Sequence, residues 1–213
     1  MGAMLRRAVL ALMVAALVLA GPAATATPAP SPATKAARIT LTKYLTKMQP
    51  NILAIKAYNA SVASATAAVE VLPGQIEAGT QGYPQAARIF GQSGDSVTKA
   101  AAGEAIIATR MSRIVPPAAL VGSHIKLVGA IQQEAPSRAG YGNRLTDCQT
   151  AYGDGLHVGD VYAFLKAATW SYPGYAVGQA ALDMKAARLT WRLNVMTYAA
   201  KLKVSVPAWV KAV

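Results

Sequence analysis

Residues 175–203, which read YAVGQAALDMKAARLTWRLNVMTYAAKLK, decide the fold. The stretch is rich in alanine, contains no proline and repeats its apolar residues at spacings of three and four, so it predicts a long final helix. At 100° per residue, these apolar residues fall on two opposite sides of the helix. One side holds Leu182, Leu189, Leu193 and Met196, and the other holds Met184, Trp191, Val195, Tyr198 and Leu202.

A helix with two apolar sides has to be covered twice. We therefore expect this helix to be central in a bundle, sandwiched between neighbouring helices. In the alternative interpretation, the side with Trp191 and Tyr198 stays open and binds a ligand, a partner protein or a second copy of the chain. Beyond the helix, Trp209 is expected to fold back onto the bundle as an apolar plug.

The rest of the chain also predicts helices, because its β-branched residues are scattered and its apolar residues recur at helical spacing. Separate helices are expected over residues 117–131 and 145–165. Breaks are expected before Pro50, at Pro73-Gly74, along the glycine-rich residues 74–94, at Pro116-Pro117 and at Tyr172-Pro173-Gly174. The pattern indicates an all-α fold, an antiparallel bundle of about five to six helices that forms a single domain over residues 34–213.

The N-terminus has the pattern of a secretory signal peptide. Arg6 and Arg7 precede an apolar run from Ala8 to Ala20, and Ala24-Thr25-Ala26 supplies the small residues of a cleavage site. The run is shorter than the roughly 20 residues that cross a bilayer. We expect residues 1–26 to be removed, which would leave no membrane span; retention as an uncleaved anchor is the alternative.

Residues 27–33, TPAPSPA, predict an extended proline-rich spacer between the signal peptide and the bundle. With the signal peptide removed, the protein is expected to be secreted or to lie in the extracytoplasmic cell envelope. The single cysteine, Cys148, cannot form an intramolecular disulfide, so stability has to come from packing.

The charge of the chain favours acidic partners. Its 213 residues include 21 basic and nine acidic ones, for a formal net charge of +12. Anionic envelope polymers, lipid headgroups, nucleic acid or an acidic protein surface would all be attracted. Nucleic acid is disfavoured, because no recognised binding module is present. The oligomeric state is left open.

On the predicted final helix, Lys185, Arg188 and Arg192 lie along one edge between the two apolar sides. This edge could contact phosphates or anionic polymers. The commoner role of such residues near a helix C-terminus is a solvated basic face.

His124 is the best single candidate for ligand chemistry. It shares a helix side with Leu120 and Leu127, so its imidazole should point inward. If the Pro116-Pro117 turn forms a simple hairpin, Glu104 lies close enough to orient the ring. Such a pair would suit a carrier of a small ligand, haem or a metal ion. A core histidine satisfied by hydrogen bonds is the commoner case.

Asp154, His157 and Asp160 are spaced by three, so a continuous helix would bring them to one face as oxygen and nitrogen ligands for a metal. Their spacing matches no specific metal motif, and neighbouring glycines favour capping roles, with Asp160 as a natural N-cap. No motif in the chain indicates a particular cofactor.

Taken together, these patterns favour an exported, non-catalytic helical-bundle protein that acts by binding or by association with the cell envelope. A carrier that uses the bundle interior around His124 is the first alternative. A hydrolase of wall polymers is the second, and it would need two carboxylates that converge in an open cleft. No Gly-x-Ser-x-Gly elbow is present in the sequence.

Overall fold

Four long helices and three short helical segments make up the residues that the structure describes. The computed structural model describes residues 30–153 and 172–212, and describes residues 172–177 by their backbone only. The long helices are α2 (Pro32–Glu70), α4 (Tyr83–Ser112), α5 (Val121–Gly153) and α7 (Tyr172–Lys201). The short ones are α3 (Leu72–Glu77), the 3-10 helix η1 (Ala118–Leu120) and α8 (Ala208–Lys211). These residues include no strand, so the predicted all-α class is confirmed.

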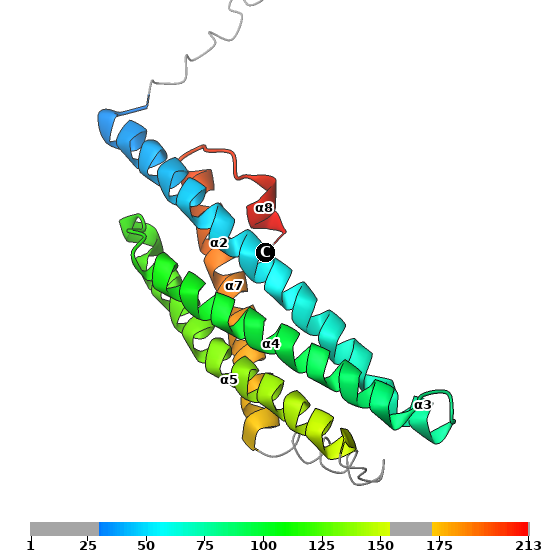
Figure 1. The fold of residues 1–213 in the computed structure, drawn as a ribbon. Helices are drawn as coiled ribbons and strands as arrows, with labels where there is room; N and C mark the ends of the chain where they lie inside the picture. The colour runs from blue at the N-terminus through cyan, green and yellow to red at the C-terminus, as the bar shows by residue number, and fades with distance from the viewer. Residues whose placement is uncertain (1–29, 154–171, 213) are drawn as a thin grey trace, which may run out of the picture. The chain divides into compact units, whose positions relative to one another are not determined.

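The long helices alternate in direction along the chain (Figure 1). α3 and a turn at Gly79, whose φ is 68°, connect α2 to α4. α4 and α5 form a hairpin at the predicted Pro116-Pro117 turn, where Pro117 immediately precedes η1. Proline suits this place because the first turn of a helix does not use its backbone N–H groups.

Two expected helix ends are wrong, because α2 continues through Pro50 and α5 continues through Pro136. The helices expected at 117–131 and 145–165 are thus joined as far as Gly153. Each proline removes one backbone hydrogen bond, but both prolines occupy exposed positions where water can reach the carbonyl that is released. Packing of the buried residues on both sides of each proline outweighs this local cost.

The expected irregular connection over residues 74–94 is also wrong, since it contains most of α3 and the start of α4. Its glycines serve close packing. A Cβ placed on Gly94 of α4 would lie 2.8 Å from the carbonyl oxygen of Gly142 on α5, so the two backbones meet where neither residue has a side chain. Sequence alone does not distinguish a helix-breaking glycine from one that lets two helices approach.

The apolar core consists of two clusters, one toward each end of the long helices. The first cluster includes Leu41, Tyr44, Met48, Ile55, Ile107, Met111, Leu127, Ile131, Trp191 and Val195. The second includes Ala65, Val69, Leu72, Ile76, Phe90, Val97, Leu145, Cys148 and Tyr152. On α2, α4 and α5, polar residues lie between the two clusters, and these residues form the site described below.

Within the described ranges, 30–153 and 172–212, α7 packs against the core on one side only. Met184, Trp191 and Val195 are buried in the first core cluster, whereas Leu182 and Leu193 on the opposite side are 62% and 51% exposed. The expectation that α7 is covered twice is therefore wrong, and so is the alternative in which its Trp191 side stays open. In an arrangement of four long helices each helix keeps an outward side, and periodicity alone does not say which side that is.

The C-terminal tail closes the Trp191 side. The chain turns at Lys203, whose φ is 54°, and α8 then brings Trp209 onto Trp191 with the two rings stacked and their centroids 6.1 Å apart. The predicted return of Trp209 to the bundle is confirmed.

One helical stretch among the described residues, Pro32–Glu77, is long and apolar enough by length and composition to cross a membrane. It comprises α2 and α3. Leu41, Tyr44 and Met48 on its inner side belong to the first core cluster.

The packing of α4 against α5 predicts opposite effects for two glycine substitutions. Gly94→Ala should lower the free energy of unfolding by about 1–3 kcal/mol, because its Cβ would meet the backbone of Gly142. Gly140→Ala, in the interior of α5 with no atom near the added Cβ, should raise it by about 0.5–1 kcal/mol. Urea unfolding of both variants checks this. Stabilisation by Gly94→Ala would contradict the close approach.

Candidate functional site

A buried ionic cluster occupies the polar layer between the two halves of the core. Arg138 of α5 donates from Nη1 to Glu104 of α4, and from Nη2 to Glu134 of α5 at 2.6 Å and to Asn59 of α2. Glu104, Glu134 and Arg138 are 0%, 2% and 8% exposed. One guanidinium therefore links three long helices at the same level of the bundle.

Two carboxyl groups share this single guanidinium. Burial raises the pKa of Glu104 to about 7, against the opposing effect of Arg138 and with a further rise from Glu134. Burial also raises the pKa of Glu134, again against the effect of Arg138. The second oxygen of each carboxyl, Oε2, is buried and has no hydrogen-bond partner within the described part of the chain. The cluster therefore favours retention of a proton near neutral pH.

A pocket of about 510 Å³ opens beside this cluster, between α2, α5 and α7. Its volume lies within the roughly 300–1,000 Å³ typical of small-molecule sites. We call it the basic pocket, because its lining includes four basic side chains and one acidic one. The lining residues are Asn59, Glu134, Arg138, Ala181, Met184, Lys185, Arg188, Leu189 and Arg192.

All three residues of the predicted basic edge line this pocket. Lys185 is exposed, while Arg188 and Arg192 are half-buried, so the edge is only partly a solvated face. Burial lowers the pKa of Arg188; the charge of Glu134 opposes this change, and the like charges of Arg138 and Arg192 add to it. The α7 side of the pocket thus places three cations close together, while the acidic residue of the lining, Glu134, is bonded to Arg138.

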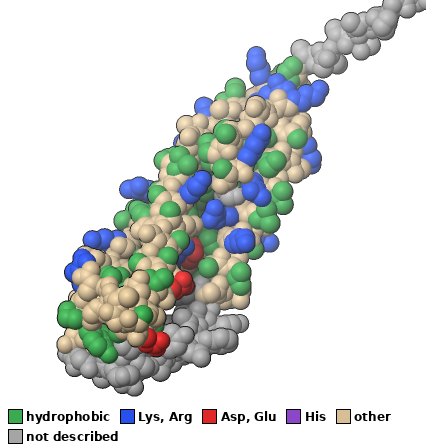
Figure 2. Space-filling model, turned by 90° about the vertical axis from the view of Figure 1, so that its right-hand side faces the viewer, with side chains coloured by type: hydrophobic (Ala, Val, Ile, Leu, Met, Phe, Trp, Pro, Cys, Tyr) green, Lys and Arg blue, Asp and Glu red, His purple; other side chains and the backbone are tan. Residues whose placement is uncertain are grey.

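The wider surface is also basic. Figure 2 shows one face of the molecule, on which Lys and Arg side chains are widely spread and acidic side chains are few. A second pocket, of about 540 Å³, lies between α2 and α4 and is lined by serine, glutamine and apolar residues such as Ser61, Gln92 and Ile89. Its lining contains no ionisable side chain. A third pocket, of about 440 Å³ between α5 and α7, has one basic and one acidic lining residue, Lys126 and Asp183, whereas the basic pocket gathers four basic side chains.

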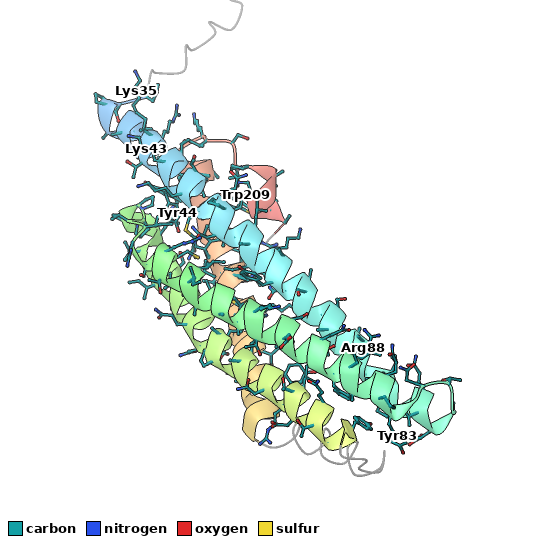
Figure 3. All side chains as sticks on the ribbon, viewed as in Figure 1. Lys35, Lys43, Tyr44, Tyr83, Arg88 and Trp209 are labelled. Carbon is teal, nitrogen blue, oxygen red and sulfur yellow. The ribbon has the colours of Figure 1, made fainter. Side chains whose placement is uncertain are left out.

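His124 is a core residue bonded at both ring nitrogens. Its Nε2 lies 3.1 Å from the carbonyl oxygen of Met111, which can only accept, so Nε2 carries the proton. Its Nδ1 then accepts from the hydroxyl of Tyr44 at 3.1 Å, and that hydroxyl accepts from Nε1 of Trp191 at 2.7 Å. Burial lowers the pKa of His124, consistent with a neutral ring. Figure 3 shows Tyr44 on α2 and Trp209 on α8.

The expected pairing of Glu104 with His124 is wrong, because Glu104 bonds to Arg138 and His124 bonds to Tyr44 and Met111. The hairpin does bring α4 and α5 together. However, His124 and Glu104 lie at different levels along it, and each is satisfied by a partner that the sequence does not reveal. The common role of such a histidine, a core residue with satisfied hydrogen bonds, is confirmed.

Trp191 and Tyr198 do not form an open binding surface. Trp191 is fully buried beneath Trp209, and Tyr198 is half-buried against the first core cluster. In this structure both residues pack against the core, and Trp191 also donates its Nε1 hydrogen bond to Tyr44.

The predicted metal residues Asp154, His157 and Asp160 lie outside the described residues. Within the described ranges, no group of three or more His, Cys, Asp or Glu side chains could hold a metal ion. Cys148 nearby is buried, and burial raises its pKa to about 12, so the thiol stays protonated.

Sequence reasoning missed Asn59, Glu134 and Arg138. The signal for two of them was present, since Leu127, Ile131, Glu134 and Arg138 follow one another at spacings of four, three and four, and the same side of the helix continues to Leu145. Charged residues on an otherwise apolar helix side indicate a buried ionic group.

Comparison of the chain with protein-family models, with curated proteins and with solved structures gave no match. We therefore infer its function from the chemistry of the basic pocket alone.

The raised pKa of Glu104 predicts that the wild-type chain loses stability as the pH rises. The folded pKa of about 7 exceeds the ordinary glutamate pKa of 4.5, so the contribution of Glu104 to stability is complete below pH 4.5 and is lost as the pH passes about 7. Glu104→Gln should flatten this part of the profile. His124 has the opposite effect. Because its pKa is lowered in the folded state, its contribution to stability is present above pH 6.5 and is lost at lower pH.

Urea unfolding of the wild type and of Glu104→Gln, followed from about pH 4.5 to about pH 8, measures both profiles. Parallel profiles for the two proteins would contradict the protonation of Glu104 in the folded state.

Proposed function

We propose that the chain is an exported, non-catalytic binding protein that holds an anionic ligand in the basic pocket. The observation that carries this proposal is the pocket lining, in which Lys185, Arg188 and Arg192 lie together on α7, while the acidic lining residue, Glu134, is already bonded to Arg138. An anion placed there would reduce the repulsion among the cations. An anionic polymer of the cell envelope, bearing phosphate or carboxylate groups, is the ligand class that we favour.

The base of the pocket is rigid, which favours binding. Glu104, Glu134 and Asn59 hold the guanidinium of Arg138 from three helices, so little side-chain entropy remains to be lost there when a ligand binds. Lys185 and the half-buried Arg188 and Arg192 come from one helix at spacings of three and four, so the spacing of their charges is set by α7.

Export is the second part of the proposal. Residues 1–26 act as a cleaved signal peptide, and residues 27–31 act as a spacer in front of α2, which begins at Pro32. The strong positive charge suits an extracytoplasmic location, because it favours contact with anionic polymers of the cell envelope.

The two alternative functions lack a supporting observation. A haem or metal carrier would use a lone pair of His124, yet one ring nitrogen of His124 donates to Met111 and the other accepts from Tyr44. A wall-polymer hydrolase would use two carboxylates in an open cleft. Glu104 and Glu134 do converge, but both are buried and bonded to Arg138.

Binding of inorganic polyphosphate, measured by calorimetry at several salt concentrations, tests the proposal. We expect the triple variant Lys185→Gln, Arg188→Gln, Arg192→Gln to bind at least about tenfold more weakly than the wild type, equivalent to about 1.4 kcal/mol. The matched control is Lys99→Gln, Arg88→Gln, Arg110→Gln, which removes the same charges from α4. Equal weakening in both variants would mean that net charge alone attracts polyphosphate, and would contradict a specific pocket.

A further inference from the structure

The outward side of α7 is a continuous apolar stripe. Leu182, Leu189, Leu193 and Met196 are all exposed, although they are large hydrophobic side chains. At 100° per residue they fall within a sector of about 60°, so they form one line along the helix. Their spacing is as regular as that of the buried side of the same helix, and an apolar line of this kind on a surface marks an interaction site.

The stripe continues into the basic pocket. Leu189 lines the pocket together with Lys185, Arg188 and Arg192. On the helical wheel these three basic residues all lie on the same flank of the stripe. One helix therefore presents an apolar line and, along its edge, a row of cations.

We propose that this outward side of α7 docks on the surface of an anionic lipid bilayer. The stripe enters the boundary between headgroups and acyl chains, while the basic residues contact the phosphates of the lipid headgroups. This inference rests on the proposed function of the pocket as an anion site, and it goes beyond the envelope polymer favoured there by adding the lipid phosphate as an anion that the same cations contact. The apolar stripe favours a bilayer over a soluble polyanion as the partner, because a soluble polyanion has no apolar region that could bury Leu182 or Leu193.

Charge argues against a second copy of the chain as the occupant. In a two-fold dimer that packs the two stripes antiparallel, the same patch of both copies meets itself. The flanking basic edges would then approach each other, and α7 carries only Asp183 as an acidic residue to balance them. Opposite charge on the partner removes this repulsion, and an anionic bilayer supplies it together with an apolar interior.

The test uses the full chain and vesicles of equal parts phosphatidylglycerol and phosphatidylcholine, with pure phosphatidylcholine vesicles as the uncharged comparison. We expect Leu182→Gln, Leu193→Gln to lower vesicle binding in sedimentation at least tenfold and to leave polyphosphate binding unchanged. The matched control is Ile106→Gln, Ile125→Gln, which removes exposed apolar side chains from α4 and α5. The control should bind vesicles as the wild type does.

A fluorescent label on α7 shows whether this surface contacts the bilayer, even if the apolar N-terminal residues also bind the vesicles. Leu193→Cys and Ile106→Cys create labelling sites of matched exposure, 51% and 53%, and the native Cys148 is buried. A polarity-sensitive dye should shift to the blue on anionic vesicles when attached at 193, and should not shift when attached at 106.

Three results would overturn the docking inference: no shift of the dye at 193, equal vesicle binding by the stripe variant and the wild type, or a wild-type dimer that the stripe variant converts to monomers. If the wild type binds polyphosphate and the α7 triple variant binds it more weakly than its control, the proposal of an anion pocket is retained and only the bilayer as its partner is wrong. If the α7 triple variant and its α4 control bind polyphosphate equally well, the proposal of an anion-binding pocket is itself wrong.

Discussion

The buried guanidinium of Arg138 is the constraint on which the rest of the structure depends. A charged group removed from water is costly unless its partners surround it. Arg138 meets this condition only when Glu104 of α4, Glu134 of α5 and Asn59 of α2 reach the same level of the bundle. Apolar contacts have no preferred direction, whereas this cluster keeps its bonds only when each donor and acceptor lie at hydrogen-bonding distance and angle. It therefore sets the register of three long helices, with an apolar cluster on either side.

The candidate site follows from the same cluster. The basic pocket lies where α7 passes Glu134 and Arg138, so its base is the rigid ionic cluster and its rim is the row of cations on α7. A second network of hydrogen bonds runs from Trp191 through Tyr44 to His124 and stabilises the other half of the bundle. Its hydrogen bonds all join groups of the protein. The first network borders a cavity and leaves two carboxyl oxygens without a hydrogen-bond partner among the described residues; in the second, both ring nitrogens of His124 are bonded. This difference separates a site suited to binding from one that only holds the fold.

The amino-acid sequence predicted the all-α class, the final helix to within a few residues, the return of Trp209 and the basic edge on α7. It did not predict the ionic cluster, because charged residues are usually assigned to the surface. Only the apolar residues before and after them on the same helix side, Ile131 and Leu145, indicate that the charged residues between are buried. Helix ends at Pro50 and in residues 74–94 were misplaced, since local preference was outweighed by packing of distant residues. Which apolar side of α7 is buried depends on the arrangement of the other helices, and that information is not local.

A double-mutant cycle between Arg138 and Glu104 measures whether this buried pair holds the helices in register. The free energy of unfolding is measured for the wild type, Arg138→Met, Glu104→Gln and the double variant, with the exposed pair Arg144 and Asp147 as the comparison. If Arg138 organises the bundle, the buried pair should show a coupling energy of about 1–3 kcal/mol, and the exposed pair less than about 1 kcal/mol. Additive effects of the two buried substitutions, within about 0.5 kcal/mol, would contradict the account.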